Sequence, residues 1–154
     1  MRWTAYTAGT VAACFAAAAL AHGPVGSIQH TRHEGFEAMG DAMKGLSTQL
    51  RSGAPVPAEM QKHSAAIAKQ APLIKTWFPK GSGPESGVKT DAKAEIWTDT
   101  TTFLSLAGNL EVESKKLVAA ANAPNFDAAV FTAQLRATGG SCKACHDKFR
   151  VDDK

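Results

Sequence analysis

Several kinds of residue are scarce in this chain of 154 residues, and each shortage excludes a class of protein. Three cysteines are too few for a small fold held together by disulfides. A net charge of +3 does not by itself indicate a nucleic-acid-binding protein. Seven prolines and thirteen glycines exclude collagen-like and low-complexity chains. With 44% hydrophobic and 20% charged residues, the composition is that of one globular domain.

Residues 1–21 have the pattern of a secretory signal peptide. Arg2 is their only charge, and the apolar stretch that follows ends in small residues at Ala19 and Ala21, where signal peptidase cleaves. A transmembrane anchor is an alternative, but the apolar run is short for one. A lipoprotein signal ending at Cys14 is another, but the residues before Cys14 are only weakly apolar. We therefore expect an exported domain of residues 22–154 in an oxidising compartment, with no membrane segment left after cleavage.

The rest of the sequence lacks the alternating pattern of β-strands and has helical periodicity instead. Apolar residues that step by three and four predict four helices, at about residues 28–52, 57–78, 90–121 and 126–149. Pro72 should kink or break the second helix, and Thr90 or Asp91 can cap the third. The fourth is expected to face inward with Phe126, Val130 and Ala133. The pattern predicts an all-α fold, an antiparallel four-helix bundle.

One motif near the carboxyl end carries chemistry. Cys142, Cys145 and His146 form a C-x-x-C-H sequence, and cysteines three apart lie on one side of a helix. This is the attachment pattern of haem c, with two thioethers to the porphyrin and one histidine nitrogen to iron. A thioredoxin-like redox pair needs a βαβ pattern, and half a zinc site needs further ligands at suitable spacing; neither is present in the sequence. A simple disulfide is the third alternative, and the histidine directly after the pair favours haem.

The position of the motif on the last helix gives a more specific resemblance. Together with Arg32, which has an apolar residue four positions later, and with the segment from Glu95 to Asp99, the sequence 141–146 resembles the cytochromes c′, the class II c-type cytochromes. The resemblance covers nearly the whole of residues 22–154. It implies a haem in the bundle core, a periplasmic location and, in many members, a homodimer built from the first two helices.

The resemblance also implies roles for individual residues. Arg32 and His33 would meet the haem propionates, and Arg150, four residues after His146, would lie in the proximal pocket. Phe36 would cover the distal face of the iron, where the low-spin cytochromes c-556 have a methionine ligand. Phe36 has no lone pair to offer, so His146 should be the sole axial iron ligand. Met39, one turn further along the helix, is interpreted as core packing rather than as a ligand.

Two functions follow, and neither requires a catalytic residue. Five-coordinate, high-spin iron would bind NO and CO and can exchange one electron. An apolar side chain over the distal face, here Phe36, disfavours dioxygen. The alternative is a low-spin electron-transfer cytochrome of the c-556 type, with a redox partner that the sequence does not identify. The sequence shows neither a nucleophile–base pair nor paired carboxylates, so we do not expect an enzyme.

Overall fold

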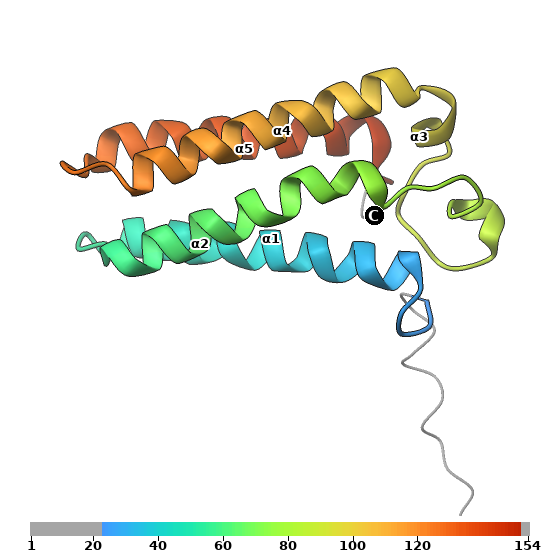
Figure 1. The fold of residues 1–154 in the computed structure, drawn as a ribbon, viewed down its shortest axis with the longest axis horizontal. Helices are drawn as coiled ribbons and strands as arrows, with labels where there is room; N and C mark the ends of the chain where they lie inside the picture. The colour runs from blue at the N-terminus through green and yellow to red at the C-terminus, as the bar shows by residue number, and fades with distance from the viewer. Residues whose placement is uncertain (1–22, 152–154) are drawn as a thin grey trace, which may run out of the picture.

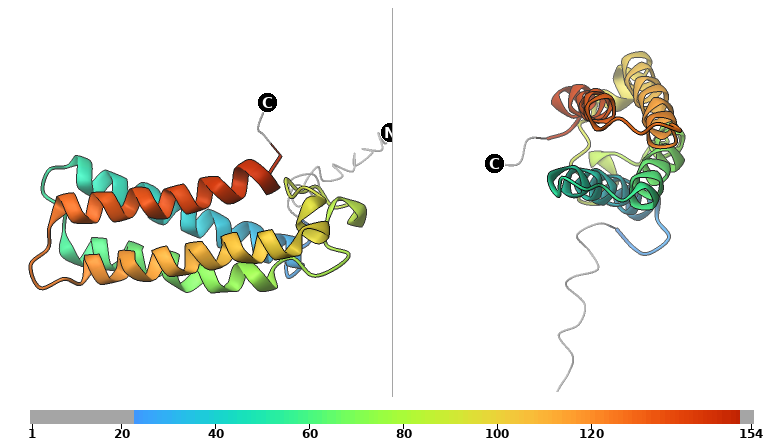
Figure 2. Two further views of the ribbon diagram at one scale, coloured as in Figure 1. Left: turned by 90° about the horizontal axis from the view of Figure 1, so that it is seen from above. Right: turned by 90° about the vertical axis from the view of Figure 1, so that its left-hand side faces the viewer.

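The computed structural model describes residues 23–151, and the predicted signal peptide lies outside them. Four long helices run alternately up and down: α1 (Ile28–Arg51), α2 (Pro57–Gln70), α4 (Thr100–Ala121) and α5 (Ala128–Phe149). Seen end-on, they surround a common axis (Figure 2). Between α2 and α4 the chain forms the 3₁₀ helices η1 (Ala71–Thr76) and η2 (Pro84–Ser86) and the short helix α3 (Glu95–Thr98) at one end of the bundle (Figure 1). The predicted antiparallel four-helix bundle is confirmed.

Residues 23–151 contain no β-strand, only an isolated antiparallel bridge between Ala92 and Arg150. None of the helices in this range is long and apolar enough to cross a bilayer.

The first helix begins and ends, and the second begins, where the sequence predicts; the second ends as an α-helix at Gln70 rather than near residue 78. Ser27 caps α1 by accepting a hydrogen bond from the backbone N–H of His30, and the chain leaves the helix before Gly53, which has a φ of 73°. In α2 the α-helical pattern ends at Gln70, and Pro72 lies in the 3₁₀ turn that follows, because proline cannot donate the hydrogen bond that would continue the helix. The predicted break at Pro72 is therefore confirmed.

Two predictions about the last two long helices are wrong. Thr90 and Asp91 do not cap the third long helix; Asp99 does, since its side chain accepts from the backbone N–H of Thr102, and α3 is a separate turn before it. In α5 Val130 is 59% exposed and Ala133 is also exposed. The buried line is instead Phe131, Leu135, Thr138 and Phe149.

The correct register of α5 can be counted backward from the cysteine pair. Steps of three and four from Cys142 lead to Thr138, Leu135 and Phe131, all of them buried. Phe126 precedes the helix, which begins after Asp127, and packs against Phe131 with ring centroids 5.6 Å apart. The inward face of the helix is thus the face that carries both thiols.

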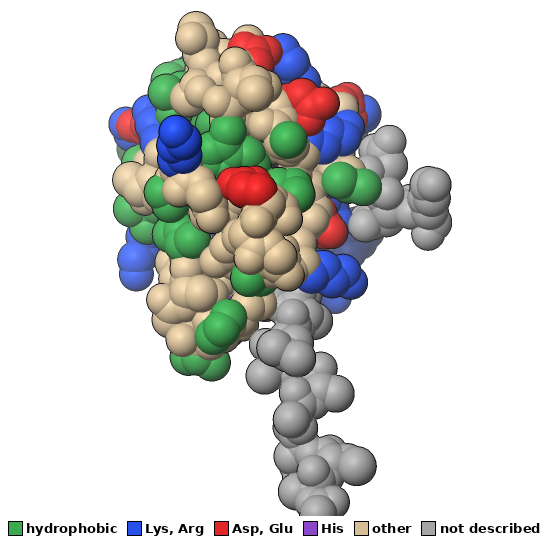
Figure 3. Space-filling model, turned by 90° about the vertical axis from the view of Figure 1, so that its right-hand side faces the viewer, with side chains coloured by type: hydrophobic (Ala, Val, Ile, Leu, Met, Phe, Trp, Pro, Cys, Tyr) green, Lys and Arg blue, Asp and Glu red, His purple; other side chains and the backbone are tan. Residues whose placement is uncertain are grey.

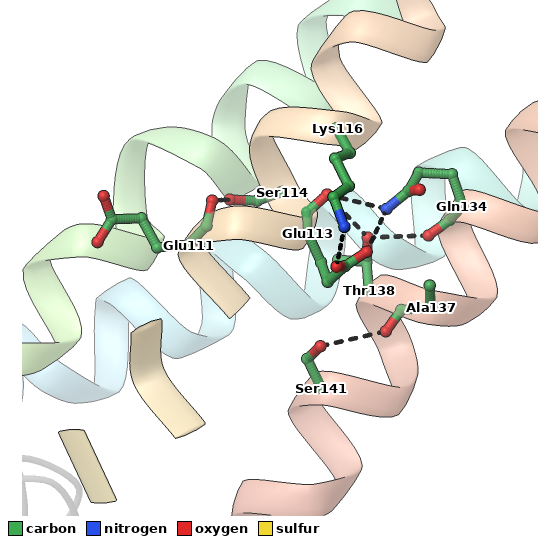
Figure 4. A network of polar contacts seen from close by, with 8 residues as sticks. All are labelled: Glu111, Glu113, Ser114, Lys116, Gln134, Ala137, Thr138 and Ser141. Carbon is green, nitrogen blue, oxygen red and sulfur yellow. Dashed lines mark hydrogen bonds and ion pairs between the residues drawn. The ribbon is translucent and has the colours of Figure 1, made fainter. Parts of the chain in front are cut away.

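A polar cluster joins α4 to α5 just before the cysteine motif (Figure 4). The Gln134 side-chain amide donates to the Glu113 carboxylate at 2.7 Å and to the Glu113 backbone carbonyl at 3.1 Å. Lys116 donates to the same carboxylate, and these two hydrogen bonds lower the pKa of Glu113. The fully buried Thr138 hydroxyl donates to the backbone carbonyl of Gln134 at 3.0 Å. These contacts fix the position of α5 along α4.

The ion pairs of Glu111 make the unfolding free energy of the protein decrease at acid pH. Its carboxylate accepts hydrogen bonds from Lys115 and from Lys75 of η1, which lower its pKa from 4.5 to about 2. Because the folded pKa lies below the unfolded one, the stabilisation is present above about pH 4.5 and is lost as the pH falls towards about 2. We expect Glu111→Gln to have a shallower loss of unfolding free energy over that window, as measured by denaturant unfolding. The exposed Glu95→Gln serves as the control, and equal acid sensitivity in Glu111→Gln and the parent would contradict this account.

Candidate functional site

A cavity of about 620 Å³ lies among α1, α4, α5 and the segment between η1 and α3. This volume is within the range of cofactor and ligand sites in proteins. In the bundle, α1 packs mainly on α2, and α5 on α4, so α1 and α5 face each other with little direct contact. The end of the bundle formed by the η1-to-α3 segment carries acidic and basic side chains interspersed with apolar ones (Figure 3). All seven predicted site residues line this cavity: Arg32, His33, Phe36, Cys142, Cys145, His146 and Arg150.

The two cysteines are free thiols, half-buried on the cavity side of α5. Burial raises the pKa of Cys142, and burial together with the neighbouring thiol raises the pKa of Cys145 to about 11. A reactive redox cysteine has a lowered pKa instead, because the thiolate is the nucleophile. No group of three or more metal-binding side chains occurs in residues 23–151. The raised pKa values of the two cysteines are therefore unlike those of a reactive redox pair.

His146 lies one residue after Cys145, and its imidazole is 6.4 Å from the Phe36 ring, centroid to centroid. Burial first, and then the positive charge of Arg150, lower the pKa of His146. The imidazole is therefore neutral at neutral pH, which is the form that binds a metal. An imidazole from α5 and an aromatic ring from α1 thus meet across the cavity.

Arg32 is a buried cation that has no carboxylate partner among residues 23–151. It is 5% exposed, and its Nη2 donates to the Ser82 carbonyl at 3.0 Å and to the Thr90 hydroxyl at 3.2 Å. Its guanidinium also lies over the ring of Phe78, 4.7 Å from the centroid. Nη1 is buried and has no hydrogen-bond partner within the described residues. A buried donor without an acceptor is costly.

The other two predicted residues lie at the rim. His33 is near the carboxylate of Glu37, at 3.8 Å, and its side chain is 40% exposed. Arg150 does not continue the helix as the sequence reasoning assumed. Its backbone is extended, with φ −109° and ψ 140°, and pairs with Ala92, while its side chain is 3.8 Å from the Asp91 carboxylate. Arg150 therefore lies near His146 because its extended segment pairs with Ala92, and not because it is one helical turn further along α5.

Sequence reasoning missed the partners of Arg32. Ser82 and Thr90 lie 50 and 58 positions further along the chain. The glycines and prolines of their loop predict flexibility, but they do not predict where the loop lies in the fold. Thr90 was identified only as a helix cap. No periodicity connects a loop to a helix at that separation, so nothing in the sequence could have identified these contacts.

A covalently attached haem fits this set of residues. The cavity is largely apolar and is bordered by two free thiols at the spacing that thioether attachment needs, followed by a neutral imidazole. The buried Nη1 of Arg32 offers a donor for a carboxylate, and a haem carries two propionates. The unpaired buried donor is therefore compatible with a bound haem.

Comparison with known proteins agrees with this geometry. A sequence profile of the family described as Cytochrome C′ matches residues 27–150. A cytochrome c′ from Pararhodospirillum photometricum is 38% identical over 120 residues, covering 77% of this chain and 92% of that protein. The crystal structure of cytochrome c′ from Thermochromatium tepidum aligns with a TM-score of 0.73 and 26% identity, covering 80% of this chain and 93% of that one. A nitric oxide complex of a variant of cytochrome c prime from Alcaligenes xylosoxidans aligns with a TM-score of 0.72 and 25% identity, covering 82% and 94%.

Motif, cavity and sequence similarity thus converge on one assignment: this chain belongs to the cytochrome c′ family, and its cofactor is a covalently bound haem c.

Proposed function

We propose that this chain binds small gaseous ligands, NO and CO, at an iron that has His146 as its single protein ligand. The observation that carries the proposal is the pairing of His146 with Phe36 across the cavity, with ring centroids 6.4 Å apart. Haem iron supplies a position for a diatomic ligand when one axial site has no protein ligand. Phe36 has no atom that can ligate iron, so it leaves that position open while restricting the space beside it.

The surroundings of Phe36 favour some gases over others. Its ring neighbours besides His146 are Trp77, at 5.2 Å, and Phe78, at 6.3 Å between centroids. Phe36 and Phe78 have no polar atom with which to stabilise bound dioxygen, which carries partial negative charge, and the six-membered ring of Trp77 packs on the α1 backbone at Gly35. NO and CO have no such requirement. We therefore propose a gas-binding protein rather than an enzyme.

We further propose that Arg32 and His33 hold the haem propionates, and that Arg150 acts in the proximal pocket. The unpartnered Nη1 of Arg32 supports the first role. The effect of Arg150 in lowering the pKa of His146 supports the last, because it keeps the imidazole available as a ligand. His33 lies one residue after Arg32 at the cavity rim.

Export and assembly are also part of the proposal. Residues 1–21 would direct the chain to the periplasm and be removed there, which places haem attachment in that compartment. The family resemblance implies a homodimer, and the exposed side chains Val56 and Leu73 flank α2 on the surface of the first helical pair. Sedimentation of the haem-loaded protein would distinguish a dimer from a monomer.

The coordination of the iron is tested by converting Phe36 to a ligand. Phe36→Met should change the ferric absorption spectrum from high-spin to low-spin, because a thioether would then bind opposite His146. Met39 lines the same cavity and is 6% exposed, so it is the residue that would support the alternative function of a low-spin electron carrier. Met39→Leu should leave the spectrum unchanged. A high-spin spectrum that appears only in Met39→Leu would refute the proposal.

The role of Phe36 as a lid is tested by removing its ring. Phe36→Ala should raise the CO association rate of the ferrous protein by about tenfold or more, equivalent to about 1.4 kcal/mol of barrier, since the entering ligand no longer displaces a phenyl ring. Stopped-flow mixing measures this rate. Unchanged kinetics would mean that Phe36 does not lie beside the iron.

The role of Arg32 is tested by separating its two sets of contacts. Arg32→Met should lower the unfolding free energy of the haem-loaded protein by about 1–3 kcal/mol, because hydrogen bonds to a charged donor are lost. It should also shift the propionate bending mode in the resonance Raman spectrum. Thr90→Val removes only the protein side of the contact and should leave that mode unshifted. A mode that is the same in all three proteins would rule out a propionate contact.

A further inference from the structure

Trp77 lies directly behind the wall of the cavity and is not part of its lining. It follows η1 as the C-cap residue and is 4% exposed. Phe36 and Phe78 line the cavity whereas Trp77 does not, and the Trp77 indole contacts the ring of Phe36 edge to face, with ring centroids 5.2 Å apart and planes at 77°. A movement of Phe36 towards Trp77, away from the cavity, would therefore displace this indole.

The six-membered ring of the indole is packed tightly against α1. A Cβ atom built on Gly35 of α1 would lie 2.1 Å from Cη2 of Trp77 and 2.4 Å from Cζ2, so the six-membered ring lies directly on the backbone of α1. Only glycine permits this approach. The α1 backbone is a rigid helical segment between Arg32 and Met39, both buried. The indole thus contacts both the backbone at Gly35 and the ring of Phe36, which is the next residue.

This arrangement limits how Phe36 can respond to an entering ligand. Protein interiors are close-packed, and a side chain changes its rotamer only where space exists. His146 occupies the side of the ring towards α5 and Trp77 the side towards η1, with centroids at 6.4 Å and 5.2 Å. A ligand that needs the volume beside Phe36 must push that ring against an indole that is itself packed tightly against α1.

We propose that Trp77 is a positioning residue that sets the rate of distal ligand binding by preventing Phe36 from withdrawing. The proposal rests on the proposed function, in which Phe36 covers the distal face. In this proposal Trp77, which does not line the cavity, limits how far Phe36 can move away from the iron. Gly35 also contributes, because only a glycine at this position lets the indole lie against the α1 backbone beside Phe36.

The test uses the full-length, haem-loaded protein and CO as the probe. Trp77→Leu gives Phe36 room to withdraw and should raise the CO association rate of the ferrous protein by about tenfold. Trp77→Phe, a smaller change, should give an intermediate acceleration if Trp77→Leu does not fold.

A matched control separates this effect from loss of stability. Leu46→Ala removes a fully buried side chain on the same helix, ten residues and about 15 Å from Phe36. It should lower the thermal midpoint and leave the CO rate unchanged. An equal acceleration in Leu46→Ala and Trp77→Leu would overturn the proposal, since the rate would then follow stability.

The double variant distinguishes failure of this inference from failure of the proposed function. Because Trp77 acts through Phe36, Trp77→Leu should have no further effect on the CO rate in a Phe36→Ala background. An additional tenfold increase there would overturn the positioning role. If Phe36→Ala accelerates CO binding while Trp77→Leu and Trp77→Phe do not, only the inference about Trp77 is wrong. If Phe36→Ala has no effect, the lid itself is wrong and the inference fails with it.

Discussion

The site depends on the placement of Cys142, Cys145 and His146 at the cavity end of one continuous helix. Steps of three and four residues bring both thiols onto the inward face of α5, in line with Thr138, Leu135 and Phe131. That buried line keeps α5 on α4 through the rest of its length, and the polar contacts of Gln134 with Glu113 hold its position along the helix. The motif therefore projects into a cavity whose other walls are already fixed.

Across that cavity, α1 contributes a charged side chain and an apolar one within two helical turns. Arg32 is a buried cation with one nitrogen unpaired, and Phe36 is an aromatic ring that packs against Trp77 and Phe78. A buried charge is tolerated only with a partner, which is why the loop at Ser82 and Thr90 closes on the guanidinium. In the proposed function, an acidic group of the cofactor binds at one end of the site and an uncharged ligand at the other. The same helix would thereby orient the cofactor and limit access to it.

The sequence predicts the local features of this protein better than its long-range ones. The bounds of α1, the break at Pro72 and the attachment motif follow from spacing and from the chemistry of single residues, and all were predicted. The inward face of α5 was misassigned because counting began at Phe126, which precedes the helix, rather than at the cysteines. The cap at Asp99 was missed because the periodicity of residues 96–121 continues through a break in the backbone. Contacts such as Arg32 with Thr90, or Trp77 with Gly35, join segments that share no periodic pattern and follow only from the packed structure.

The central claim is that the iron is held by the protein from one side only. The absorption spectrum of the purified protein, ferric and ferrous, before and after addition of NO, tests this claim most directly. The account predicts a high-spin spectrum in both oxidation states and a large spectral change with NO. A low-spin spectrum with a sulfur–iron band, insensitive to added ligand, would contradict it.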